Sequence, residues 1–260
     1  MKIVALVKYV PDASGDREFE DDLTVDRESD GLLSELDEYA VEQALQVTES
    51  LDGDHEVIAV TVGPDDASAA IKKSLQMGAT SGVHINDEDI EGSDALATSA
   101  VLAAAVNKIG PDLVIAGMAS TDGSMGVVPA MLAERLGWPG VTLGVDLQVS
   151  GDTVRIRRDG DIASQTIEAS LPAVVSVTDQ SGEARYPSMK GVMAAKKKPV
   201  EDWDLDDLGV DSGQVGAGAA YTKVVDATAR PPKGAGVAIA DEDGTGAAAV
   251  FEFLSAGKYL

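Results

Sequence analysis

The sequence predicts an α/β protein with a parallel sheet and helices on both faces. Short apolar runs rich in β-branched residues alternate with segments whose apolar residues recur at helical spacing. Two of the runs, residues 3–10 and 113–116, are almost entirely apolar, which is typical of parallel strands covered on both faces. Ligands of such sheets bind at the carboxyl ends of the strands, so we expect the loops after Val10, Val62 and Ala116 on that side.

The first half of the chain supplies this alternation in order. Strands are expected at 3–10, 56–62, 82–85 and 113–116, with a short edge strand at 23–25. Capping and stop signals predict helices from Ser34 to about Ser50, from Asp65 or Asp66 to Met77, from Ser93 to about Ile109, and over 127–136.

The pattern changes after Pro139. Strand-like runs at 141–149, 153–158 and 164–170 are separated by Gly-Asp turns and predict an antiparallel β excursion over 140–170. A buried strand is expected again at 171–177. Residues 1–210 should therefore form one α/β domain. Residues 211–260, rich in Gly, Ala and Asp and containing Arg230-Pro-Pro-Lys233, should form an arm with a short helix at 247–254 that packs on another subunit.

Composition excludes several functions. The net charge of −25, from 45 acidic and 20 basic residues, argues against a nucleic-acid surface and fits a protein of a salt-loving microbe. Cysteine is absent and only His55 and His84 are histidines, so we expect no metal site, and no set of residues stands out as catalytic. The N-terminus has no secretory pattern and no apolar run could span a bilayer, so the protein is expected to be cytoplasmic.

One segment has the pattern of an anion site. Leu113–Ala116 predicts a strand, residues 117–126 are small and flexible, and residues 127–136 predict a helix that ends at Gly137. The first N–H groups of such a helix have no partner within it, and they attract anions together with the helix dipole. Gly123 and Gly126 would let a phosphate approach the backbone. An ordinary strand-to-helix connection has the same pattern, and neither a Walker lysine nor a G-x-G-x-x-G motif is present. A redox carrier, a nucleotide-dependent transferase and a ligand-sensing module all remain open at this point.

Several short motifs share their order and spacing with a known family. Over residues 1 to about 210, the chain resembles the beta subunit of electron transfer flavoproteins, including the Fix-type branch. The opening strand Lys2–Asp12 is similar to that of the family, and Asp37–Ala44 resembles its "DEIAVEEA" helix. Further matches are Leu75–Ala79 ("LAMGA"), Leu136–Pro139, Leu171–Val175, and Pro187–Lys190 with Ala194–Pro199 ("PSMK…AKKKP").

The resemblance implies a Rossmann-like, adenine-nucleotide-hydrolase-like fold and a carrier function. The chain would pair with an alpha subunit that holds a redox-active FAD, and would pass electrons from dehydrogenases to a quinone reductase or another acceptor. It would itself hold AMP, or a second FAD in the electron-bifurcating branch. Carried over by position, the nucleotide would contact Leu6, Ser34, Leu36, Val62, Gly117, Ser120, Thr121, Asp122, Gly123, Ser124, Met125, Gly126, Val127 and Val128.

The chain departs from the family at two places. Ser34-Glu35 stands where Asn-Pro is frequent, and the expected phosphate loop contains glycine and valine where the family is often rich in Asp, Asn, Gln and Thr. Phosphate contacts would rely on backbone N–H groups and on Ser124 or Thr121, which leaves AMP and FAD both open.

The segment 179–195 is similar to the family's recognition loop for dehydrogenases. Tyr186, Met189, Lys190 and Met193 are the expected docking residues, with Met189 at the position of the apolar anchor. A flexible, exposed methionine suits docking to several partners.

Two other classes share this architecture. An enzyme of the ATP-pyrophosphatase type would need a phosphate-loop motif early in the chain, which residues 10–12 do not supply. A nucleotide-sensing module of the universal-stress type would be shorter and would lack the β excursion and the arm.

Overall fold

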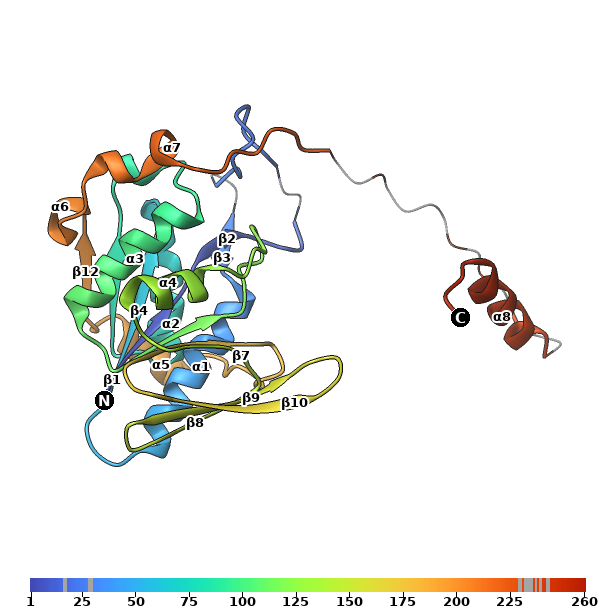
Figure 1. The fold of residues 1–260 in the computed structure, drawn as a ribbon, viewed down its shortest axis with the longest axis horizontal. Helices are drawn as coiled ribbons and strands as arrows, with labels where there is room; N and C mark the ends of the chain where they lie inside the picture. Colours follow the sequence, from blue (N-terminus) through green and yellow to red (C-terminus); the bar gives the residue numbers. More distant parts are fainter. Residues whose placement is uncertain are drawn as a thin grey trace. The chain divides into compact units, whose positions relative to one another are not determined.

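A seven-stranded sheet forms the centre of the computed structural model (Figure 1). Its strand order is β12-β5-β4-β1-β6-β11-β7, and every neighbouring pair is parallel. The strands are β1 Lys2–Leu6, β4 Glu56–Val62, β5 Ser81–Ile85, β6 Leu113–Gly117, β7 Gly140–Gly144, β11 Ala173–Val177 and β12 Val200–Trp203. The structure describes the whole chain except residues 16–17, 28–29, 229–230, 232–235, 237, 239 and 242–243.

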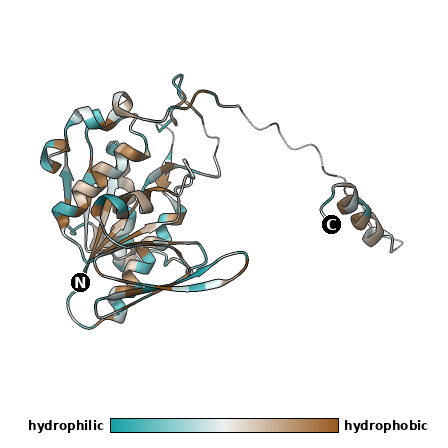
Figure 2. Ribbon diagram, in the orientation of Figure 1, coloured by the Kyte–Doolittle hydropathy of each residue, from teal (hydrophilic) through white to brown (hydrophobic). Residues whose placement is uncertain are grey.

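Helices cover both faces of this sheet, as predicted. Ile3 and Ala5 pack with α1 (Glu35–Ser50) and α2 (Ser68–Met77). Val4 and Leu6, which point to the other face, pack with α3 (Ala95–Ile109) and α4 (Val128–Leu136). Hydrophobic colour is concentrated on the central strands in Figure 2. The expected α/β class with a Rossmann-like parallel sheet is therefore confirmed.

The β excursion is smaller than predicted. Only β8 (Asp146–Ser150), β9 (Thr153–Asp159) and β10 (Ser164–Ser170) form the separate antiparallel sheet. The expected strand 141–149 is split, because β7 stays in the main sheet beside β11, and Leu143, with φ +64°, lies where the chain begins to turn away. Val149, Val154 and Ile156 extend the apolar cluster on the α1 side.

The first expected strand is also divided. β1 ends at Leu6. The Val7 N–H still donates to the Val60 carbonyl oxygen of β4, but the N–H of Lys8 donates to the Asp37 carboxylate at 2.9 Å. β2 (Tyr9–Pro11) then pairs antiparallel with β3 (Gly31–Leu33) in a sheet of its own. The predicted edge strand 23–25 is reduced to one bridge between Phe19 and Val25, since Leu23 has a left-handed φ of +67°.

Two predicted helix starts differ in detail. Asp94, rather than Ser93, caps α3, and its carboxylate accepts hydrogen bonds from Leu96 and Ala97 N–H at 3.0 Å. Residues Asp65–Ala67 form a 3-10 turn before α2 instead of capping it. The positions of helix ends depend on single hydrogen bonds, which periodicity alone does not resolve.

The edge strand β12 and the helix α5 (Met189–Ala195) were not predicted from the sequence. β12 pairs with β5, with Trp203 opposite Ile85. The segment 179–195 is thus irregular only up to Ser188, and Met189, Lys190 and Met193 are helical.

The chain divides into two units, Met1–Val225 and Asp226–Leu260, which are described separately. The first unit ends with α6 (Leu205–Leu208), a 3-10 turn at Ser212–Gln214, and α7 (Gly216–Ala219). The second contains α8 (Gly246–Ala256), which confirms the expected terminal helix, whereas Arg230 and Lys233 lie outside the described residues. Within the described ranges, no helix is long and apolar enough to cross a membrane, and no cluster of His, Asp and Glu could hold a metal.

Candidate functional site

The expected nucleotide residues lie at the carboxyl ends of three neighbouring strands. Leu6 ends β1, Val62 ends β4 and Gly117 ends β6, and β1 lies between the other two. Ser34 and Leu36 begin α1 at the same level, and the Ser34 N–H donates to the Lys8 carbonyl oxygen at 2.9 Å. The fold therefore brings the first four residue positions of the expected site to one edge of the sheet, beside Gly117.

Gly117 is where β6 comes closest to α1. A Cβ at this position would lie 2.5 Å from Asp37 Oδ1 and 2.8 Å from the Leu36 carbonyl oxygen, so no side chain fits. The buried Asp37 carboxylate accepts hydrogen bonds from the backbone N–H groups of Lys8 and Gly117 and so joins β1 to β6. Burial raises the pKa of Asp37 to about 7, although these N–H groups and the charge of Lys8 oppose the shift.

The loop that follows is compact at its base and exposed at its tip. Ser124 donates from its N–H to the Ser120 carbonyl oxygen at 3.0 Å, while residues 123–126 are exposed. Ser124 and Gly126 have φ values of +54° and +66°, and Met125 is 62% exposed. Val127 and Val128 are half-buried where α4 begins, and no side chain among the described residues caps that helix. Its first backbone donors are therefore available to an anion.

An ion cluster holds this loop against the start of the chain. Asp122, whose side chain is only 3% exposed, contacts Lys8 Nζ at 2.9 Å and an Arg27 guanidinium nitrogen at 2.8 Å (Asp122 Oδ2 in both pairs). Burial acts to raise the pKa of Asp122, but the charge of Lys8 and hydrogen bonds from Ser120, Lys8 and Arg27 hold it well below its usual range. Asp122 is thus a fixed anion, and two cations lie beside the exposed loop tip.

Sequence reasoning missed Lys8, Arg27 and Asp37 as members of this site. Lys8 is the only charge in the apolar run 3–10, and Asp37 lies in phase with the buried Ala40, Val41 and Ala44. A charge at an apolar position is a usable signal, because a buried charge requires a partner. Arg27 carries no such signal, because its segment is polar throughout and only the tertiary structure brings it to Asp122.

Two buried hydroxyls at this edge of the sheet have no hydrogen-bond partner among the described residues. The Ser34 hydroxyl is completely buried at the strand ends and has no hydrogen-bond partner among the described residues. The hydroxyl of Thr61, one residue before the end of β4, is also buried and has no hydrogen-bond partner among the described residues. Buried hydroxyls without partners are rare and call for an explanation, and a polar ligand at this edge provides one.

The expected docking residues are exposed in a different region. Tyr186 is 92% exposed, Met189 81% and Met193 59%, and Lys190 is also exposed. Ser188 caps α5 by accepting a hydrogen bond from the Gly191 N–H at 3.1 Å, which fixes the start of the helix that carries both methionines. An apolar surface of this kind suits contact with another protein.

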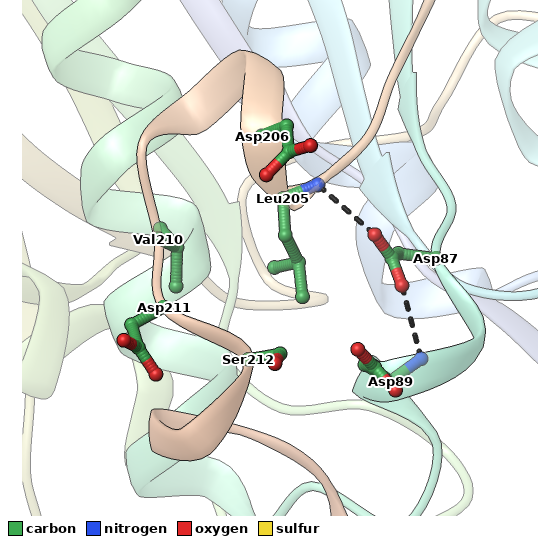
Figure 3. Close-up of a pocket in the computed structure, with 7 residues that line it drawn as sticks. All are labelled: Asp87, Asp89, Leu205, Asp206, Val210, Asp211 and Ser212. Atoms are coloured by element: carbon green, nitrogen blue, oxygen red, sulfur yellow. Dashed lines mark hydrogen bonds between the residues drawn. The ribbon is translucent and has the colours of Figure 1, made fainter.

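The cavity shown in Figure 3 lies elsewhere, at the carboxyl ends of β5 and β12. It measures about 360 Å³ and is lined by Asp87, Asp89, Leu205, Asp206, Val210, Asp211 and Ser212. Asp87 holds its two sides together, because its carboxylate accepts from the N–H groups of Asp89 and Leu205. None of the expected nucleotide residues lines it, and its carboxylates would repel a phosphate.

The fold and the strand-end loop together define a Rossmann-like α/β protein with an anion-site geometry. Residues 22–208 match the family described as "Electron transfer flavoprotein domain". The chain is 45% identical to an electron transfer flavoprotein subunit beta of Mycobacterium leprae, covering 99% of both chains. It is 33% identical to the protein of that name from Methylophilus methylotrophus, covering 86% of this chain and 87% of the relative. It is also 32% identical to the "Caffeyl-CoA reductase-Etf complex subunit CarD" of Acetobacterium woodii, covering 91% and 90%.

The chain therefore belongs to the electron transfer flavoprotein family, within which it is a beta subunit. The resemblance noted in the sequence is confirmed over the whole chain. The universal-stress and ATP-pyrophosphatase alternatives find no support in these similarities.

Proposed function

We propose that this chain forms a heterodimer with an alpha subunit that carries FAD. The heterodimer takes electrons from dehydrogenases and delivers them to a quinone reductase or another acceptor. Family membership supports this proposal. The flavin would supply the redox chemistry, while the residues of this chain bind a nucleotide, orient the subunits and dock the electron donor.

The nucleotide site of this chain is the strand-end loop Gly117–Val128 together with Leu6, Ser34, Leu36 and Val62. The observation that carries this proposal is the buried Ser34 hydroxyl, which has no partner among the described residues. The uncapped start of α4 follows β6, the strand next to β1 in the sheet. Ser120, Thr121 and Ser124 can add hydroxyl contacts, and the backbone of Gly123 and Gly126 allows close approach of a phosphate. AMP and FAD share the adenosine and phosphate groups that such a site would bind.

The first test measures the bound ligands. The heterodimer is purified in high salt after co-expression, denatured, and its released FAD and AMP are quantified per dimer. One FAD and one AMP would indicate a carrier with one flavin, and two FAD without AMP would indicate an electron-bifurcating protein of the Fix-type branch. Absence of any adenine nucleotide beyond the FAD of the alpha subunit would contradict the site.

The docking role is tested by the variant Met189→Ala. Removing the exposed side chain should slow electron transfer from dehydrogenases and leave the heterodimer intact, because Met189 contacts little within this chain. Ile162→Ala is the matched control, since Ile162, like Met189, is an exposed apolar side chain, but it lies between β9 and β10. Equal transfer rates for the wild type and Met189→Ala would contradict the docking role.

The arm that follows residue 210 is proposed to pack on the alpha subunit. Helix α8 has no buried residue, and Val250, Phe251 and Phe253 are all more than half exposed. Truncation before about residue 225 should lower the amount of alpha subunit that co-purifies with this chain. A yield equal to that of the full-length chain would count against this role.

A further inference from the structure

We infer that Arg185 is a positioning residue for partner docking, because it clamps the base of the docking segment, residues 179–195, onto helix α1. This inference rests on the proposed docking function. It assigns to Arg185 no contact with the dehydrogenase itself. Its role is to hold Tyr186 and Met189 in their exposed positions.

All three side-chain nitrogens of Arg185 donate hydrogen bonds to two glutamates of α1. Its Nε and one terminal nitrogen contact the two carboxylate oxygens of Glu42 at 2.7 and 3.0 Å. The terminal nitrogens also contact both oxygens of Glu49, at 2.6 and 3.0 Å. The backbone N–H of Arg185 donates to Glu42 as well, at 3.1 Å. A planar guanidinium bonded to two carboxylates in this way has one orientation, which a single exposed ion pair would not impose.

Glu42 makes this clamp sensitive to the loss of its partner. Its side chain is only 7% exposed, and one of its oxygens also accepts a hydrogen bond from Gln46 at 2.8 Å. Burial acts to raise the pKa of Glu42, but the hydrogen bonds from Arg185 and Gln46 outweigh it, so the carboxyl stays ionised. Without Arg185, Glu42 would be a buried carboxylate without a cation, which is a strongly unfavourable state.

The docking segment has little else to hold it. Among the described residues, 182–187 donate no hydrogen bond to another backbone group, since the bonds resume only with Val192 N–H to the Ser188 carbonyl oxygen. A further hydrogen bond to α1 comes from Gln43, whose side chain donates to the Ser181 carbonyl oxygen at 3.0 Å. Ala184 is partly buried and packs against the apolar cluster to which α1 contributes. Beyond Ser188, the segment is anchored through α5. Among the described residues, the hydrogen bonds that hold the stretch between these two anchors, which carries Tyr186, are therefore those of Arg185.

Helix α1 provides a rigid support for this clamp. Glu42 and Glu49 lie seven residues apart on one face of the helix, and Ala40, Val41, Ala44 and Val47 bury its other side in the core. A side chain fixed to such a helix confines the attached segment before the partner arrives. Preordering of this kind increases affinity, because less conformational entropy is lost on binding.

The test compares Arg185→Gln, Arg185→Lys and Arg155→Gln in the heterodimer. Arg155 is the matched control, because it loses the same charge from an exposed pair with Glu168 at 3.9 Å on the excursion sheet. Each complex is assayed with the dehydrogenase that reduces the wild type fastest, at several dehydrogenase concentrations. Reduction by dithionite, which requires no docking, measures the flavin directly.

Arg185→Gln should raise the KM for the dehydrogenase about fivefold, as expected for a segment that must become ordered on binding, while kcat and dithionite reduction change less than about twofold. Arg185→Lys should lie between Arg185→Gln and the wild type, because an ammonium keeps the charge but cannot bond both carboxylates in a planar fork. Arg155→Gln should match the wild type. Hydrogen exchange of the backbone amide of residue 185, whose N–H donates to Glu42 in the wild type, should be faster in Arg185→Gln.

An unchanged KM in Arg185→Gln, together with a raised KM in Met189→Ala, would overturn the inference and leave the docking function standing. An unchanged KM in both variants would overturn the docking function itself. If Arg185→Gln fails to assemble with the alpha subunit, Glu49→Gln carries the test, because Glu49 is largely exposed and its loss leaves the Glu42 pair intact. That variant should raise KM about twofold, and a KM equal to the wild type would overturn the inference.

Discussion

Two regions at the carboxyl edge of the same sheet have opposite chemistry. Over β4-β1-β6, the loop 117–128 lies beside Lys8 and Arg27, which hold the buried Asp122. Over β5 and β12, a cavity is lined by four aspartates, and no basic residue lines it (Figure 3). The first region offers donors and cations to an anion, while the second repels one. The difference teaches that two parts of one sheet edge can suit opposite ligands, because charge and unsatisfied polar groups decide which ligand each can bind.

The largest expected difference between the two regions is in the pH dependence of the free energy of unfolding, to which the titration of Asp37 contributes. Its folded-state pKa of about 7 exceeds the value near 4 expected in the unfolded chain, so the folded state binds more protons between these values. Stability from this group is therefore complete below about pH 4 and decreases as the pH rises towards 7, by up to about 4 kcal/mol.

Asp37→Asn should remove this slope from the pH dependence of the free energy of unfolding, measured with denaturant between pH 4 and 8. Asp206→Asn, at the exposed acidic edge, is the control and should keep the wild-type slope. Parallel curves for the wild type and Asp37→Asn would show that Asp37 titrates normally, and that the two regions do not differ in this respect.

The loss of Asp122 should have the next largest effect. Asp122→Asn removes the carboxylate shared by Lys8 and Arg27, and the free energy of unfolding at pH 7 should fall by about 2 kcal/mol. The partial exposure of the two cations keeps this cost below that of a fully buried pair. The folded-state pKa of Asp122 is lowered, so this contribution is present above about pH 4 and is lost as the pH falls further. Chemical denaturation of the wild type and Asp122→Asn at pH 7 and at pH 3 measures the loss of unfolding free energy and its pH dependence. A loss that is the same at pH 3 as at pH 7 would contradict an electrostatic origin of this loss.

The smallest effect is expected at the acidic edge itself. Asp206→Asn removes one of several neighbouring negative charges and should stabilise the protein by about 0.3 kcal/mol at low salt. The gain should vanish in about 1 M KCl, where the screening length is about 3 Å. Thermal unfolding at both salt concentrations measures the difference. A destabilised variant at low salt would show that this edge is not governed by repulsion.

The sequence predicted those elements that depend on local patterns. β4 was predicted at its observed bounds, and the fully buried β11 was expected because all its residues except Ser176 are apolar. β12 was not predicted from the sequence, because only half of its four residues, Val200 to Trp203, are apolar and the strand forms by pairing with β5. The division of residues 3–10 into β1 and β2 was also not predicted from the sequence. It occurs where the Lys8 N–H donates to Asp37, which is far along the chain.

The same distinction holds for the proposed sites. The loop 117–128 could be found from its small residues between a strand and a helix, and Met189 from its position in the family motif. Asp122 was noted, but neither of its cations was, because Lys8 and Arg27 are 114 and 95 residues away along the chain. Arg185 was part of a motif, yet its partners on α1 are more than 130 residues away.

By itself, therefore, the sequence determined the alternation of strands and helices, the two-faced sheet and the family. These depend on periodicities and motifs that extend over a few residues. Only the tertiary structure decided which charges are buried, which of them are paired, and which hydroxyls remain without a partner. The reason is that a side chain's electrostatic environment depends on distances through space between elements that the chain order does not reveal.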